Sequence, residues 1–216
     1  MSFKNRQDAG KQLCQLLTQY KDQDVIVYAL PRGGVVVAAE IAKYLHAPLD
    51  LILAHKIGHP NYEEYAVAAV SEKGHLIGTP SELESVNDSW LQHEKNRQIE
   101  EIKRKRALYL KGRKDADVED KVAIIVDDGI ATGLTMHVGI LELKDRNPSK
   151  IVVVVPVSPK ETADKISSLV DDFVAVVIPA EHMFLGAVGA YYDVFDQVED
   201  EEVIDILKHY SGDISM

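Results

Sequence analysis

Residues 122–135 read VAIIVDDGIATGLT, an apolar run that ends in two carboxylates and passes through small residues into an expected helix. Ligands of open α/β sheets bind at the carboxyl ends of strands, and free N–H groups at a helix N-terminus favour phosphate. Gly129 and Gly133 allow a tight turn and a close approach of the backbone to a ligand. Asp127 and Asp128 are hydrogen-bond acceptors suited to a vicinal diol or a metal shell. The stretch predicts a sugar-phosphate site, with the diol on the acids and the phosphate on the amides.

Other phosphate-binding motifs fit this stretch less well. A Walker A loop requires Gly-Lys-Ser/Thr, whereas Gly133 is followed by Leu134. No G-x-G-x-x-G follows an expected strand, so a dinucleotide-binding fold is unsupported. A flavodoxin-like phosphoacceptor domain also places acids at a strand end, but it does not need the Thr-Gly-x-Thr of residues 132–135. An ordinary strand, turn and helix with solvated acids explains a glycine but not the whole combination.

Apolar strands alternate with helical segments on both sides of this stretch. Such alternation predicts an α/β fold with a mostly parallel, doubly wound sheet. The expected strands are residues 25–30, 49–54, 122–126, 151–155 and 173–178, with a weaker hairpin at 66–71 and 75–78. The expected helices are residues 5–20, 35–45, 88–110, 134–144, 159–170 and 199–210. We expect residues 1–216 to form one domain, with a helical insertion at about 79–115 and a small C-terminal hood at about 179–216.

The composition is that of a globular protein. The 216 residues are 46% hydrophobic and 27% charged, which is enough to bury a core. The net charge of −11 argues against nucleic-acid and membrane-surface partners, because both are polyanions. The lone cysteine, Cys14, forms no intrachain disulfide, and neither a signal peptide nor a membrane-spanning run is recognisable. We therefore expect a cytoplasmic location.

The stretch at 122–135 resembles the motif of type I phosphoribosyltransferases that binds 5-phosphoribosyl-1-pyrophosphate (PRPP), because it combines an acid pair, a small linker, Thr-Gly and a final Thr. The resemblance implies the type I phosphoribosyltransferase fold, with Asp127 and Asp128 on the ribose hydroxyls. It places the 5-phosphate on Ala131, Thr132, Gly133, Leu134 and Thr135. It also implies Mg²⁺ as the cofactor, with Asp127 and Asp128 as candidate contacts through water.

A second anion site is expected at residues 29–34, ALPRGG, where the first buried strand ends. This loop resembles the pyrophosphate loop of the same family, in which a basic residue is followed by glycine. The resemblance assigns pyrophosphate to Arg32, Gly33, Gly34 and Lys56. It also implies a cis or otherwise unusual backbone at Pro31–Arg32. Several family members carry Arg-Lys where this chain has His55-Lys56, so His55 has no assigned role and Lys56 is either a ligand or a solvated lysine.

Residues 58–65 are polar and turn-rich, and they are placed like the flexible catalytic loop of the family. Hypoxanthine-type members carry an aspartate where this chain has Ala131, whose methyl group cannot accept a proton. We therefore expect Glu64 to act as the general base, with hypoxanthine and guanine as poor acceptors. The catalytic residues that this interpretation implies are Glu64, Arg32 and Lys56. The alternative is an ordinary solvated loop.

Two further segments have less defined roles. The hood resembles a small element of the family that contacts the base. Its base-pocket candidates are Met183, Phe184, Val188 and Tyr191, each of which plain packing explains equally well. Basic residues crowd positions 95–114, which form either a solvated helix face or a lid or subunit contact that faces the phosphates.

The resemblance as a whole implies an Mg²⁺-dependent pentosyl glycosyltransferase of nucleotide metabolism. Such an enzyme moves a phosphoribosyl group from PRPP to a nitrogenous base or other amine, releases pyrophosphate, and is expected to be a homodimer. The alternatives are a non-catalytic protein of the same fold that senses PRPP or a nucleotide, and hydrolysis of a ribosyl phosphate bond.

Overall fold

The central sheet has five parallel strands in the order β2-β1-β6-β7-β8. The structure, a computed structural model, describes residues 2–210. The strands are β1 (Val25–Ala29), β2 (Leu49–Leu51), β6 (Val122–Val126), β7 (Lys150–Val157) and β8 (Asp172–Val177). Every residue of β1 and β6 is buried, as in strands that helices cover on both faces. The doubly wound parallel sheet expected from the sequence is confirmed.

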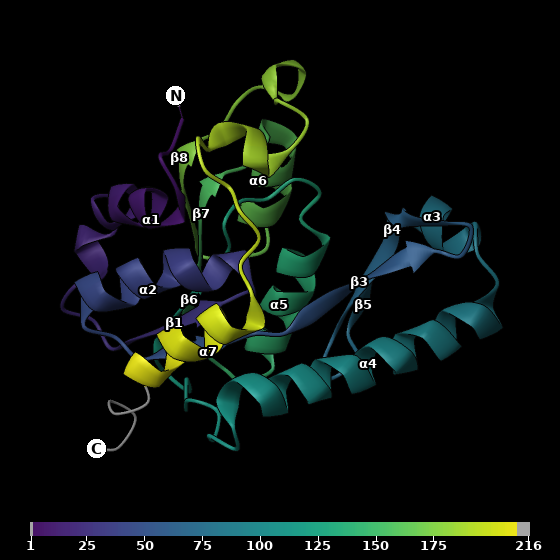
Figure 1. The fold of residues 1–216 in the computed structure, drawn as a ribbon, viewed down its shortest axis with the longest axis horizontal. Helices are drawn as coiled ribbons and strands as arrows, with labels where there is room; N and C mark the ends of the chain where they lie inside the picture. Colours follow the sequence, from purple (N-terminus) through teal and green to yellow (C-terminus); the bar gives the residue numbers. More distant parts are fainter. Residues whose placement is uncertain (1, 211–216) are drawn as a thin grey trace.

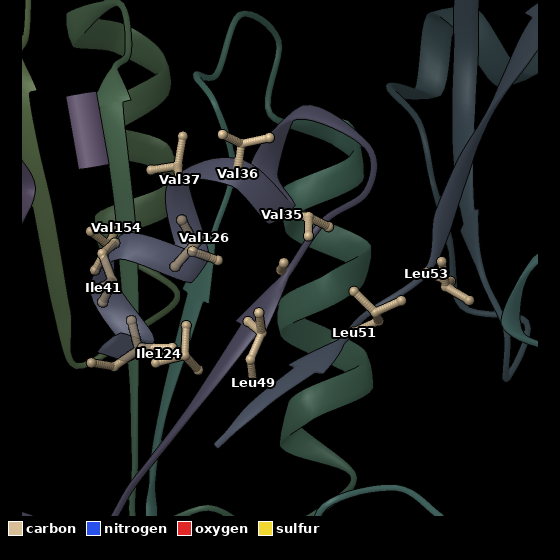
Figure 2. Packing of buried hydrophobic residues seen from close by; sticks show 14 of the residues in the cluster. Val35, Val36, Val37, Ile41, Leu49, Leu51, Leu53, Ile124, Val126 and Val154 are labelled. Carbon is tan, nitrogen blue, oxygen red and sulfur yellow. The ribbon is translucent and has the colours of Figure 1, made fainter. Parts of the chain in front are cut away.

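Helices cover both faces of this sheet (Figure 1). One face carries α1 (Arg6–Cys14), α2 (Gly33–Leu45) and α7 (Asp200–His209), and the other carries α5 (Leu134–Lys144) and α6 (Lys160–Ser167). Figure 2 shows Ile41 of α2 packed beside Ile124 of β6. The next residue, Ile125, belongs to the second core with Met136 and Ile140 of α5, because successive strand side chains point to opposite faces.

The first helix is shorter than the expected 5–20. Its N-cap is Asn5, whose side chain accepts a hydrogen bond from the N–H of Asp8, and the helix ends at Cys14. The apolar spacing continues in the 3₁₀ turn η1 (Thr18–Tyr20), which buries Tyr20. The tighter turn keeps this aromatic ring in the core after the α-helix has ended.

A second, antiparallel sheet forms an arm with a long helix. It contains β3 (Ala54–His59), β4 (Tyr62–Ser71) and β5 (Leu76–Ile77), and α3 (Pro80–Glu84) and α4 (Asp88–Leu110) follow. Figure 1 shows β3, β4 and α4 extending together away from the main sheet. The expected hairpin at 66–71 and 75–78 is confirmed as the pairing of β4 with β5.

Two expectations about this arm are wrong. The strand expected at 49–54 stops at Leu51, and Ala54 begins a separate strand. Residues 58–65, expected to be a turn-rich flexible loop, are the end of the β3–β4 hairpin, in which His59 pairs with Tyr62. Tertiary packing accounts for the difference, because Ile57 of β3 is fully buried and α4 packs against both β3 and β4.

The hood follows β8 and contains two 3₁₀ turns, η2 (Glu181–Met183) and η3 (Val188–Tyr191). The N-terminus holds it in place, because the Phe3 N–H donates to the carbonyl of Tyr191 at 2.8 Å. Residues 211–216 of the expected hood lie outside the described residues. Within residues 2–210, no helix combines the length and the apolar composition needed to cross a membrane.

Candidate functional site

A cavity of about 600 Å³ lies at the carboxyl ends of β1 and β6, between the hood and the arm. This is the edge of a parallel sheet at which ligands bind. Residues 127–133 and Thr135 all line it, so the stretch predicted to bind a sugar phosphate surrounds an open space. The volume is within the range of small-molecule sites.

The acid pair is held in place from three sides. The Asp128 N–H donates to Asp127 Oδ1 at 2.8 Å, Arg6 Nε donates to Asp128 Oδ2 at 2.7 Å, and the Tyr192 hydroxyl donates to the Asp128 carbonyl at 2.6 Å. Within residues 2–210, the other oxygen of each carboxylate receives no N–H donor. Burial, and then the charge of Asp128, raise the pKa of Asp127 well above its ordinary value. The pair therefore offers two oxygens to hydroxyl groups or a cation.

The loop before α5 presents unpaired amides. Gly133 caps the helix with φ 77°, a conformation that favours glycine. The first helical hydrogen bond runs from His137 N–H to the Gly133 carbonyl at 2.9 Å, so the amides of the preceding turn have no intrahelical acceptor. The Thr162 hydroxyl donates to the Ala131 carbonyl at 2.8 Å and fixes the loop to α6. Free N–H groups at a helix N-terminus favour an anion, so the loop has the donors that the predicted phosphate site requires.

Gly33 brings the start of α2 against the acid pair. A Cβ atom on Gly33 would lie 1.9 Å from Asp128 Oδ2 and 2.8 Å from Arg6 Nε. On Gly34 it would lie 2.9 Å from the Val126 carbonyl oxygen. Any side chain here would push α2 away from the acids, so the glycine pair is a packing requirement of the site.

The PRPP site that the family resemblance implies predicts that Gly33→Ala weakens Mg-PRPP binding by about 1–3 kcal/mol, because overpacking displaces the Asp128 carboxylate and its Arg6 partner. Isothermal calorimetry measures this effect. The control is Gly10→Ala, whose Cβ would lie 2.9 Å from Glu40 Cβ in the α1–α2 contact. That variant should lose stability but not affinity; equal affinity of Gly33→Ala and wild type would contradict the prediction.

The arm contributes a lysine and a histidine from β3. Lys56 is exposed and lines the cavity, as expected of a ligand candidate. His55 also lines it, with Nδ1 2.9 Å from Gln98 Oε1 of α4. Burial lowers the pKa of His55, which favours the uncharged imidazole.

The basic segment 95–114 was expected to form either a solvated helix face or a contact that faces the phosphates, and its residues are found in both settings. Lys105 of α4 lines the cavity. Lys103 and Arg104 instead form exposed ion pairs with acids one turn earlier, Glu100 and Glu101. Lys105 therefore reaches the cavity, whereas Lys103 and Arg104 serve the helix surface.

The Arg32 side chain is turned toward α7. Its Nη1 lies 3.5 Å from Glu199 Oε2 and 3.7 Å from Asp200 Oδ1, and it is Pro31 that lines the cavity. The Pro31–Arg32 peptide bond is cis, as predicted. Pyrophosphate binding by Arg32 stays a prediction, and it requires the side chain to leave α7.

Four other predicted residues, Gly33, Gly34, Glu64 and Leu134, are not among those that line the cavity. Glu64 is exposed on β4. Leu134 lines a separate space of about 490 Å³ on the other side of the loop 127–133. Phosphate binding by Leu134 and proton transfer by Glu64 stay predictions. Glu64 can reach the cavity only if the β3–β4 hairpin moves.

The hood candidates are divided as well. Val188 lines the cavity, and its methyl groups close off Gly129, where a Cβ would lie 2.4 Å from Val188 Cγ1. Tyr191 is buried and stacks on Phe184 with ring centroids 5.7 Å apart. Met183 is 63% exposed. The structure places Val188 beside the acid pair. The other three candidates belong to the hood and do not line the cavity.

Several cavity residues were missed by the sequence interpretation. They are Arg6, Gln98 and Phe195. Arg6 carries the one recognisable signal, because a basic residue in the first turn of a helix opposes the helix dipole and suggests a tertiary partner. Its partner, Asp128, is 122 residues away in the sequence. No local pattern indicates that pairing.

The donor set fits Mg²⁺ shared with a ligand. Among the side chains that the structure describes, no cluster of three or more His, Cys, Asp or Glu could hold a metal ion. Asp127 and Asp128 nevertheless give the cavity two carboxylates, and Mg²⁺ commonly binds through one or two carboxylates, waters and substrate phosphates. The cavity therefore suits a magnesium complex of a phosphorylated ligand.

The chain is similar to a known protein family, to curated proteins and to a solved structure. Residues 4–192 match the phosphoribosyl transferase domain family. Two curated proteins from strains CDC 1551 and H37Rv of Mycobacterium tuberculosis, provisionally named phosphoribosyl transferases, are each 34% identical over 215 residues, which is 99% of this chain and 48% of theirs. The chain thus spans about half the length of these curated relatives. The crystal structure of TT1426 from Thermus thermophilus is 35% identical with a TM-score of 0.80, covering 97% of this chain and 99% of that one.

Proposed function

This chain belongs to the phosphoribosyltransferase family, and from that membership we propose that it transfers the phosphoribosyl group of PRPP to a nitrogen of a small acceptor and releases pyrophosphate. One observation carries the proposal. A single cavity joins an acid pair with free carboxylate oxygens to a helix N-terminus with free amides. A sugar phosphate needs both features, at this relative placement, in one site.

In this proposal the ribose and its phosphate bind to the loop after β6. Asp127 and Asp128 accept hydrogen bonds from the two ribose hydroxyls. The 5-phosphate lies on the amides of residues 131–135, where the partial positive charge of the α5 N-terminus favours an anion. The Thr132 and Thr135 hydroxyls add donors. These contacts fix the sugar while C1 faces the open part of the cavity.

Pyrophosphate would lie between the start of α2 and β3. Its ligands in this proposal are Lys56 and the amides of Gly33 and Gly34, with Arg32 joining when it leaves Glu199. Fixed cations and N–H groups at the leaving group lower the barrier, because negative charge grows there in the transition state. Mg²⁺ bound with PRPP, at the carboxylates of the acid pair through water, supplies further charge neutralisation.

The reaction exchanges one bond for another. The C1–O bond to pyrophosphate breaks with its electron pair on the leaving oxygen, and the acceptor nitrogen forms the C1–N bond with its lone pair. A proton on that nitrogen, where there is one, passes to Glu64 in our proposal. We also propose a homodimeric, cytoplasmic, single-domain protein, on the strength of the family resemblance and the composition.

A PRPP or nucleotide sensor of the same fold is the second candidate function. Two placements favour it: Glu64 lies outside the cavity, and Arg32 is paired with acids of α7. A sensor would bind the same ligand through the same loop. It differs in one measurable respect, because it would not release pyrophosphate.

The test is pyrophosphate release from Mg-PRPP over a panel of purines, pyrimidines and other amines.

We expect the double variant Asp127→Asn, Asp128→Asn to fold and to lose about 1–3 kcal/mol of PRPP binding energy, which is the scale of hydrogen bonds to charged groups. Calorimetry with Mg²⁺ measures it, and Asp22→Asn, at an exposed acid remote from the cavity, is the control. Tight binding by wild type without turnover on any acceptor would favour the sensor; unchanged affinity of the double variant would remove the acid pair from the site.

A further inference from the structure

The cavity wall at the start of α2 presents a cation that the sequence did not indicate. Of the groups assigned to pyrophosphate, Lys56 lines the cavity, but residues 32–34 do not. A Cβ atom on Gly33 would lie 1.9 Å from Asp128 Oδ2 and 2.8 Å from Arg6 Nε, so these two side chains stand directly against the start of α2. Both of them line the cavity. An anion that approaches this wall therefore meets Arg6.

The Arg6 side chain is fixed by three contacts. It is 11% exposed, its Nε donates to Asp128 Oδ2 at 2.7 Å, and its Nη1 donates to the Asp196 carbonyl at 2.7 Å. The Phe195 ring covers one face of the guanidinium, with its centroid 3.8 Å from Cζ. The guanidinium is therefore held in one orientation before any ligand binds.

The third nitrogen, Nη2, is left for a ligand. Among the described residues none accepts a hydrogen bond from it, and it is accessible to solvent. In a guanidinium, Nη2 projects on the same side as Nε, and the two form the fork that binds paired oxygens. Nε is directed at Asp128, which lines the cavity, whereas Nη1 is directed at Asp196, which does not. Nη2 therefore lies on the cavity side of Arg6.

The position of Arg6 decides which anionic group of PRPP it can meet. PRPP carries anionic oxygens on its 5-phosphate and on its pyrophosphate. The 5-phosphate is assigned to residues 131–135, before α5. Arg6 stands at the start of α2 instead, and this is the wall assigned to pyrophosphate.

We propose that Arg6 binds the pyrophosphate group of PRPP through Nη2 and is a catalytic residue of the transfer. The inference rests on the proposed function and adds to it a cation from α1. When the C1–O bond breaks with its electron pair on the pyrophosphate oxygen, negative charge grows beside a donor that is already in place. The acceptor nitrogen still forms the C1–N bond, and Arg6 gives up no proton. Nε meanwhile keeps Asp128 oriented toward the ribose.

The test uses the two halves of PRPP as separate probes. Magnesium pyrophosphate and ribose 5-phosphate are titrated by calorimetry into wild type and Arg6→Gln, both with Mg²⁺ present. We expect the ratio of pyrophosphate affinity to ribose 5-phosphate affinity to fall at least about tenfold, which corresponds to about 1.4 kcal/mol. A residue that only positions Asp128 would weaken ribose 5-phosphate binding at least as much as pyrophosphate binding, so the ratio separates the two roles.

Two further variants complete the test. Arg6→Lys keeps a positive charge beside Asp128 and so protects the fold, but its single ammonium cannot replace the fork, and the ratio should fall at least roughly threefold. The matched control is Lys11→Gln, which removes one exposed charge from the same helix and should leave the ratio unchanged.

The outcomes separate this inference from the proposed reaction. An unchanged ratio in Arg6→Gln overturns the inference, whether both affinities persist or both fall together. A wild-type protein that binds ribose 5-phosphate but not magnesium pyrophosphate overturns it as well. Arg6-dependent binding of pyrophosphate without its release from Mg-PRPP, on any acceptor, would instead overturn the transfer reaction and leave the Arg6 site in place.

Discussion

Replacing Arg113 with methionine is expected to lower the free energy of unfolding by about 3–5 kcal/mol, the cost of leaving one partner of a buried ion pair alone. Asp50 of β2 is fully buried, and its Oδ1 lies 3.0 Å from Arg113 Nη2. The same nitrogen donates to the Leu49 carbonyl at 2.8 Å. Arg113 follows α4 directly, so the pair joins the arm to the edge of the main sheet. Urea unfolding followed by Trp90 fluorescence measures the loss.

Two comparisons make this stability prediction specific. Arg104→Met removes an exposed cation of α4 that is paired with Glu101, and it should cost less than about 1 kcal/mol. Asp50→Asn combined with Arg113→Met removes both charges and should recover part of the loss, because no buried charge is left without a partner. A single Arg113→Met variant within about 1 kcal/mol of wild type would show that the carboxylate of Asp50 is sufficiently stabilised by the N–H groups of Leu51 and Ala116, which donate to it at 2.8 Å each.

The main sheet and the loop 127–133 are predictable because local sequence determines them. The run 122–126 is apolar at every position, which in a parallel sheet is the pattern of a strand covered on both faces. Gly133 then supplies the positive φ with which α5 begins. A strand, a sharp turn and a helix start are each encoded within a few residues. The part of the cavity that residues 127–135 form can therefore be predicted from one stretch of sequence.

The walls of the cavity are less predictable, because distant segments build them. Arg6 meets Asp128 across 122 residues, and Phe195 reaches Arg6 from the other end of the chain. The β3–β4 hairpin was missed for a different reason. Polar residues dominate 58–65, and the strand pairing there depends on the cover that α4 provides rather than on an alternating pattern. Tertiary contacts decide both features.

We expect Glu64→Gln to lower the maximal rate by about 10²–10⁴-fold on the true acceptor, the usual scale of general acid–base catalysis. Glu64 is exposed on β4. On the same hairpin Lys56, which lines the cavity, pairs with Ala69, so Glu64 stands about five residues farther out, or roughly 17 Å along the strand. A carboxylate at that distance can take a proton only if the hairpin bends inward.

The hairpin has a place at which to bend. Its pairing register shifts on both sides of Gly58, which weakens the ladder between the cavity and the tip. The Tyr65 hydroxyl donates to Glu82 Oε1 at 2.8 Å and holds the outer part of β4 against α3. Closure must break this bond, which is exposed to solvent and therefore stabilises the open hairpin only weakly.

Steady-state kinetics at saturating Mg-PRPP test the role of Glu64. The variant should bind PRPP as wild type does, because a base that acts on the acceptor proton contributes to the rate and not to sugar binding. Glu119→Gln, at an exposed acid beyond α4, is the control and should keep the full rate. A Glu64→Gln enzyme at full rate would mean that the acceptor nitrogen already carries a free lone pair, as a pyridine nitrogen or an aryl amine does, and that the hairpin serves another purpose than proton transfer.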